Sequence, residues 1–182
     1  MTSAQRARLR TFPYLLRALV PLTLLVVFAV IFAWPRGDDT AKVQTIDPAP
    51  AIAQAQERAP YDLLVPPSSG PGALGDGWRP TSTRIDAGPA SNDPFVFRIG
   101  YVTPAGQYAT FLESNDAPAA VVASIGATRG QDTETIDGVD WTRASTVARG
   151  ETVLSRTAGE VTLVVTGSAA LDELRTLAGS LR

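Results

Sequence analysis

The side chains available for chemistry in this 182-residue chain are of few kinds. The chain has no histidine and no cysteine, and its one lysine is Lys42. These absences exclude an imidazole base, a thiolate nucleophile and a zinc site of the usual nitrogen and sulfur ligands. Carboxylates, tyrosines and arginines remain for catalysis or binding, and we expect neither a metal nor a cofactor.

Two pairs of acidic residues lie close together in the sequence, Glu113 with Asp116 and Glu134 with Asp140. Glycoside hydrolases use two carboxylates about 5–10 Å apart across a substrate cleft. Asp116 is also placed to cap a helix and Asp140 to flank a turn, and both are ordinary structural roles. We therefore expect no catalytic residues and a protein that is not an enzyme.

Trp78 and Trp141 are candidates for an aromatic surface that binds sugars or lipids, because each begins or lies within a predicted strand near a glycine. A large aromatic ring is more often a core residue than a ligand contact. Trp78 follows a loop and is the better candidate for a partly exposed ring, whereas we expect Trp141 in the core.

A second candidate lies in the hairpin predicted over residues 95–114. A four-residue loop, Thr103–Gly106, would place Arg98 opposite Phe111, with Glu113 on the diagonal. We predict that these three side chains share the outer face of the sheet as a ligand-binding patch. The simpler interpretation is a cation–π contact and an ion pair on a solvated face.

A third candidate depends on Asp137-Gly138, the strongest hairpin signal in the chain. Pairing across this turn places Glu134 opposite Trp141, and the next turn places Arg143 opposite Arg156. Two arginines facing each other on the core side are destabilising unless an acid or a ligand lies between them. We predict a polar cluster of Glu134, Arg143 and Arg156 that contacts an anion or a sugar; the simpler interpretation is a peripheral salt bridge.

The elements that must position these residues follow from the hydrophobic pattern. It predicts strands over residues 78–85, 95–102, 107–114, 133–136, 139–147, 151–156 and 160–166, and helices over residues 116–127 and 169–181. This order favours an α+β fold, in which an antiparallel sheet of about six or seven strands has two helices packed on one face.

The longest apolar stretch covers residues 18–35, between Arg17 and Arg36. Its 17 uncharged residues from Ala18 to Trp34 would form a helix about 26 Å long, close to the ~30 Å of a bilayer core. Arginines precede this stretch and no acid occurs before Asp38. We therefore predict a basic cytoplasmic tail (1–17), a transmembrane helix (18–35) and an extracytoplasmic remainder. The rival, a cleaved signal peptide, lacks a good cleavage site.

Residues 36–60 are rich in proline, alanine, aspartate and glutamine, which is typical of a linker, and we place the domain at residues 61–182. Within the linker, residues 51–58 could form a short helix. The 12 basic and 18 acidic residues after position 35 give this part a net charge of −6. Such a charge argues against nucleic acid and anionic lipid as partners.

Four segments resemble those of a known family, and together they span most of the chain: Gly77–Thr81, Gly100–Pro104, Gly138–Trp141 and Thr166–Leu181. They are similar to an actinobacterial membrane-anchored family that is catalogued as a domain of unknown function (number 4245). The resemblance implies an envelope protein with one N-terminal membrane helix, and it implies no activity.

We therefore expect a single-pass protein of the cell membrane, with its N-terminus in the cytoplasm and a non-enzymatic binding domain outside. Its expected partner is an envelope protein, a wall glycan or a lipid, and not nucleic acid. The alternatives are a lipid or small-molecule carrier with a cavity between sheet and helices, and, less favoured, a carboxylate-dependent hydrolase.

Overall fold

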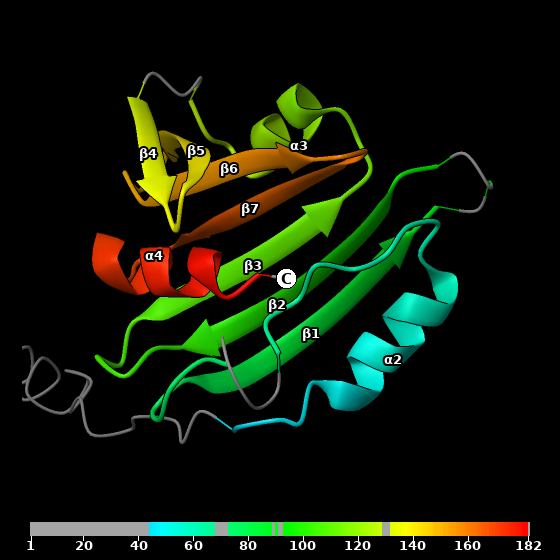
Figure 1. Ribbon diagram of the computed structural model, residues 1–182, viewed down its shortest axis with the longest axis horizontal. Coiled ribbons are helices and arrows are strands. Elements are labelled where there is room, and N and C mark those ends of the chain that lie inside the picture. The colour runs from blue at the N-terminus through cyan, green and yellow to red at the C-terminus, as the bar shows by residue number, and fades with distance from the viewer. Residues whose placement is uncertain (1–43, 68–72, 89, 91–92, 129–131, 182) are drawn as a thin grey trace, which may run out of the picture. The chain divides into compact units, whose positions relative to one another are not determined.

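The computed structural model describes residues 44–67, 73–88, 90, 93–128 and 132–181. Seven strands form one antiparallel sheet in the order β1-β2-β3-β7-β6-β5-β4 (Figure 1). In chain order the elements are α2 (Ala49–Arg58), β1 (Arg79–Ala87), β2 (Phe95–Val102), β3 (Tyr108–Ser114), α3 (Pro118–Ser124), β4 (Asp132–Ile136), β5 (Val139–Ser145), β6 (Thr152–Ala158), β7 (Val161–Gly167) and α4 (Leu171–Gly179). The predicted α+β class and antiparallel sheet are confirmed.

The predicted transmembrane helix (18–35) and its basic tail lie outside the described residues. Among the helices of the described part, none is long and apolar enough to cross a membrane.

The main hydrophobic core lies on one face of the sheet, here called the core face. Its side chains come from alternate strand positions, as the twofold period of a strand requires, and Phe97, Phe111, Leu154 and Leu163 are fully buried there. Helices α2 and α4 and the segment 60–67 lie over this face (Figure 1). From α4, Leu174 and its neighbours in the apolar stripe pack against the strands.

The prediction that the helices at residues 116–127 and 169–181 pack on the same face of the sheet is wrong. Helix α3 packs on the opposite face, here called the second face, where Val121 contacts Leu112, Val153 and Val164. These strand residues alternate with the core-face residues, so β3, β6 and β7 are apolar on both sides and need cover on both. Helix α4, in contrast, packs on the core face.

The predicted boundary between linker and domain at residue 60 moves towards the N-terminus. The compact unit begins at Gln44, and the fully buried Ala55 of α2 belongs to the main core. The backbone N–H of Ile46 also donates to the carbonyl oxygen of Pro80 at 2.9 Å. Residues 44–60 therefore belong to the domain; the short helix predicted at 51–58 is present, and its small apolar face docks on the sheet.

The predicted register of the β2–β3 hairpin is wrong by one residue. The loop has five residues, because the N–H of Thr103 donates to the carbonyl of Gln107 and Val102 pairs with Tyr108. A slip of one residue moves side chains to the other face of a strand relative to its partner. Arg98 accordingly pairs with Leu112, and Glu113 pairs with Phe97.

Candidate functional site

A row of side chains crosses the core face and includes most of the charged residues that this face carries. Glu113 pairs with Leu163, and Leu163 pairs with Arg156. The Arg156 guanidinium carbon lies 5.1 Å from the centroid of the Trp141 ring, and Trp141 pairs with Glu134 on the edge strand. Two acids and an arginine thus share one line across the sheet, beside α4 and the segment 60–67.

Glu113 is fully buried. The backbone N–H of Leu64 donates to both of its carboxylate oxygens, at 3.1 and 3.3 Å. Burial raises the pKa of Glu113 to about 7, although the Leu64 hydrogen bond and the charge of Arg156 oppose this rise. The carboxyl group therefore fastens the segment 60–67 to the sheet, and it does so in a site where its ionised form is disfavoured.

Tyr61 lies at the start of the same segment. Its hydroxyl donates to the carbonyl of Phe95 at 3.4 Å, and its ring meets the Phe95 ring edge-on with centroids 6.0 Å apart. The pKa of Tyr61 is raised, first by burial and second by the charge of Glu113. Tyr61 therefore remains a neutral hydrogen-bond donor.

Arg156 stacks over Trp141, an arrangement that favours a cation through the negative face of the ring. Its Nε is buried and has no hydrogen-bond partner among the described residues. Burial lowers the pKa of Arg156, and the charge of Glu113 opposes that change. Trp141 is 1% exposed, which confirms that it is a core residue.

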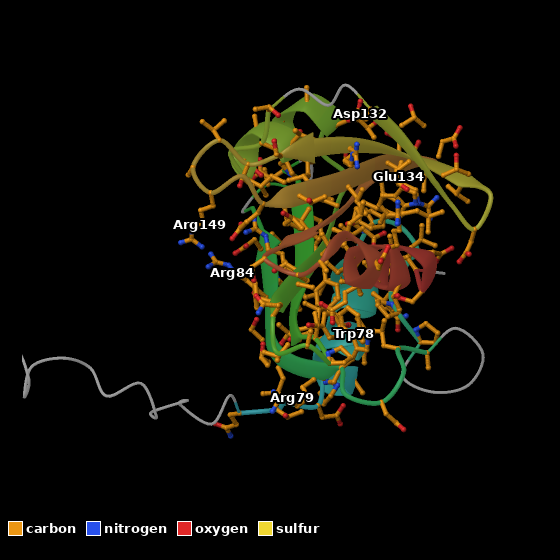
Figure 2. The ribbon with its side chains drawn as sticks, turned by 90° about the vertical axis from the view of Figure 1, so that its left-hand side faces the viewer. Trp78, Arg79, Arg84, Asp132, Glu134 and Arg149 are labelled. Atoms are coloured by element: carbon orange, nitrogen blue, oxygen red, sulfur yellow. The ribbon has the colours of Figure 1, made fainter. Side chains whose placement is uncertain are left out.

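The predicted polar cluster of Glu134, Arg143 and Arg156 forms only in part. Glu134 lies 2.6 Å from Arg175 of α4 and 3.9 Å from Arg143, and Figure 2 labels it where the edge strand faces that helix. Arg143 also binds Asp132 at 2.9 Å.

The predicted pairing of Arg143 with Arg156 is wrong, because Arg143 pairs with Leu154. This shift of two residues leaves both arginines on the core face, so Arg156 lies beside Trp141 rather than opposite Arg143. Arg175, the strongest partner of Glu134, was not predicted. It lies 41 positions along the chain from Glu134, and no local pattern could have indicated the contact.

The predicted patch of Arg98, Phe111 and Glu113 does not exist. Phe111 and Glu113 are buried on the core face, whereas Arg98 lies on the second face. There it pairs across strands with Arg84 and Leu112. The cause is the one-residue difference in loop length.

The two predicted acid pairs do not converge. Asp140 pairs with Thr135 and accepts a hydrogen bond from its hydroxyl at 2.7 Å, on the face opposite to Glu134. Glu113 is buried and accepts hydrogen bonds from the N–H of Leu64. Asp116 follows β3 and accepts a hydrogen bond from the N–H of Ala117. Asp116 does not cap α3, whose N-cap residue is Ala117.

Trp78 borders an apolar pocket of about 300 Å³ at the start of β1. Its half-buried ring meets the Tyr101 ring edge-on, with centroids 6.0 Å apart and an interplanar angle of 80°. The partial exposure predicted for Trp78 is confirmed. The remaining lining residues are Ile46, Asp47, Pro48, Ile52, Pro66, Pro67, Leu74 and Pro80.

A shallower groove of about 510 Å³ lies between α4 and the β4–β5 turn. Arg175 and Thr176 border it from α4, and Thr135 and Asp137 border it from the hairpin. No group of three or more acidic residues in the described ranges is arranged to hold a metal ion.

A family model matches residues 8–181 and so covers nearly the whole chain. The chain belongs to the DUF4245 family. Its description is "Protein of unknown function (DUF4245)", which confirms the predicted resemblance to domain of unknown function number 4245. No curated protein and no solved structure matches the chain significantly.

In this DUF4245 chain, the two acids of the row across the core face are both held by contacts within the fold. Glu113, whose pKa is raised, is fully buried beneath the segment 60–67. Glu134, on the edge strand of the same face, forms ion pairs with Arg175 and Arg143. The accessible features of the described residues are the Trp78 pocket, the groove beside α4 and the polar part of the second face that α3 leaves uncovered.

Proposed function

We propose that this protein is a membrane-tethered binding domain outside the cytoplasm, which holds an apolar group of a partner protein in the Trp78 pocket. The observation that carries the proposal is the pocket itself. At about 300 Å³ it has the size of a small ligand site, and its lining is mostly apolar. Among the described residues that border it, Asp47 is the one that carries a charge.

The pocket is built from side chains that lose little freedom on binding. Four of its lining residues are prolines, at positions 48, 66, 67 and 80, and the proline ring fixes one backbone dihedral angle. The edge-on contact with Tyr101 holds the Trp78 ring. A preformed pocket of this kind binds with a smaller entropic penalty than a flexible surface.

The size and place of the pocket favour an apolar side chain over a whole lipid. The centre of the core face is filled, since Phe97, Ile99 and Phe111 are fully buried there, and the pocket lies at the α2 side of the sheet. The alternative of a lipid carrier, which needs a large cavity between sheet and helices, is therefore less favoured. The hydrolase alternative is less favoured because its acid pairs do not meet.

The proposed membrane tether limits how far the pocket can lie from the membrane surface. If residues 18–35 span the bilayer, the eight residues 36–43 separate the span from the first described residue. An extended chain covers about 3.5 Å per residue, so the domain starts within about 30 Å of the membrane surface. The partner is therefore expected to be another membrane or envelope protein.

Photo-crosslinking in native membranes tests the proposal. A photoreactive residue replaces Ile52, which lines the pocket, in the full chain; a matched control replaces Val147, which is 76% exposed and distant in the fold. We expect a discrete product at position 52 whose added mass is that of a second polypeptide, and none of the same mass at position 147. Trp78→Ala should abolish the product, whereas Trp78→Phe, which keeps an aromatic ring, should retain most of it.

Three results would each contradict the proposal. The first is the same product from both positions, and the second is a product at position 52 that survives in Trp78→Ala. The third is a product whose added mass, measured by mass spectrometry, matches a lipid, which would identify a lipid in the pocket instead of a protein.

A further inference from the structure

The second face of the sheet carries a polar surface on the strands that α3 leaves uncovered. We call it the arginine–hydroxyl surface and define it by Ser82, Arg84, Arg98, Tyr108 and Thr110. Strand pairing places these residues on one side: Arg84 lies opposite Arg98, and Ser82 and Thr110 both lie opposite Gly100. Within the described residues, α3 is the helix that packs on this face, and it does so against β6 and β7.

The two arginines of this surface are direct cross-strand neighbours, which is destabilising for like charges. The Nε of Arg84 donates to both carboxylate oxygens of Asp86, at 2.8 and 2.7 Å. In Figure 2, Arg84 projects from the side of the sheet away from α4. The Nε of Arg98 is buried and has no acceptor among the described residues. Asp86 thus pairs with Arg84, whereas the Nε of Arg98 lacks an acceptor among the described residues. An oxyanion placed between the two guanidinium groups would relieve their repulsion.

Hydroxyl groups gather one row away from the arginines, and a glycine makes room for them. A Cβ atom at Gly100 would lie 2.5 Å from the Tyr108 hydroxyl oxygen and 2.5 Å from Ser82 Oγ. Both hydroxyls therefore lie over the bare backbone of Gly100, with Thr110 on the neighbouring strand. The Tyr108 side chain is exposed, at 45%.

We propose that the arginine–hydroxyl surface binds an anionic glycan, a sugar chain that carries sulfate, phosphate or carboxylate groups. Guanidinium groups recognise planar or tetrahedral oxyanions through paired hydrogen bonds. Hydroxyl groups such as those of Ser82 and Thr110 exchange hydrogen bonds with sugar hydroxyls. The exposed ring of Tyr108 offers an apolar face with a polar tip. An extended sheet face presents these groups in rows, which suits an extended polymer.

A glycan fits this surface better than an anionic bilayer does. The part of the chain after residue 35 carries a net charge of −6, and this field opposes approach to a broad negative surface. A single anionic group between Arg84 and Arg98 interacts at contact distance with two guanidinium charges, which outweigh the one adjacent carboxylate, Asp86, and the more distant acids. This surface and the Trp78 pocket lie on opposite faces of the sheet, so the two proposals are independent.

The test measures binding of the full chain in detergent micelles to a fluorescent dextran sulfate oligosaccharide, with neutral dextran as the reference probe. We expect saturable binding of the sulfated probe at low salt and none of the neutral one. Arg98→Gln should weaken binding about tenfold or more. The matched control, Arg149→Gln, removes the same charge from the exposed β5–β6 connection and should change the affinity less than about twofold.

Two further variants keep the result interpretable. Arg84→Gln changes a side chain that is 71% exposed, so it should fold normally and still weaken binding if Arg98→Gln proves unstable. Tyr108→Phe removes the hydroxyl alone and should weaken binding a few-fold.

The proposal is overturned if the sulfated probe does not bind, or if Arg98→Gln and Arg149→Gln weaken binding equally, which would indicate a diffuse charge effect. It is also overturned if vesicles with anionic phosphatidylglycerol bind through Arg98 while the sulfated probe does not. That outcome would assign the surface to lipid headgroups.

Discussion

Replacing Glu113 with glutamine should change how the stability of this protein depends on pH. Glu113 titrates at about 7 in the folded chain instead of at its ordinary value of 4.5. The folded state therefore holds the proton more tightly than the unfolded state, and between these two pH values the free energy of unfolding falls as pH rises. Each pH unit of the interval corresponds to about 1.4 kcal/mol, so the loss attributable to Glu113 approaches about 3 kcal/mol and is complete above pH 7.

Glutamine has nearly the same shape, stays neutral, and can accept the hydrogen bond from the N–H of Leu64 through its amide oxygen. We therefore expect Glu113→Gln to be less stable than, or equal to, the natural chain at pH 4, and to gain on it by about 3 kcal/mol at pH 8. The measurement is urea unfolding of the full chain in detergent micelles at pH 4, 5, 6, 7 and 8, followed by tryptophan fluorescence.

The control for this experiment is Glu160→Gln, at the exposed turn between β6 and β7. Its stability difference from the natural chain should stay within about 0.5 kcal/mol at each pH. The reasoning is refuted if the difference between Glu113→Gln and the natural chain does not change between pH 4 and pH 8. Such a result would mean that the protein stabilises the ionised form of Glu113 to the same extent as water does in the unfolded chain.

Two further substitutions test the packing that holds these sites. Gly167→Ala would bring a Cβ within 2.1 Å of the Tyr108 carbonyl oxygen and should destabilise the fold by about 3 kcal/mol or more, whereas Gly150→Ala, with open space around it, should lose only about 1–2 kcal/mol from its positive φ. Ala55→Glu buries a charge in the core beneath α2 and should lower the urea midpoint strongly; the exposed Ala53→Glu should change it little. Equal effects within either pair would contradict the assigned packing.

The strands and turns of this fold were predictable from the sequence because their signals are local. Alternating apolar residues define β2 at Phe95–Val102, the range that the pattern predicts. Asp137 and Gly138 both have positive φ, at 49° and 79°, as the hairpin turn that their residue types favour requires. The pairing of Glu134 with Trp141 across that turn followed correctly.

Most of the candidate site depends on loop length, helix packing and long-range contacts, which the local sequence pattern does not specify. One extra loop residue, Gln107, turns Glu113 from an outer-face position into the fully buried carboxyl that holds Leu64. The contribution of α2 to the core could not be predicted from its few apolar residues, and it becomes clear only from the packing of Ala55 against the main core. Contacts such as Glu134 with Arg175 join distant parts of the chain.

The sequence by itself determined where the strands, the helices and the apolar segment lie, since each of these depends on neighbouring residues. The tertiary structure decided which face each side chain occupies, because the register of a strand pair is set by loop geometry and by packing against elements far along the chain. The two arginines of the second face and the buried acid of the core face therefore acquire their surroundings only in the folded sheet.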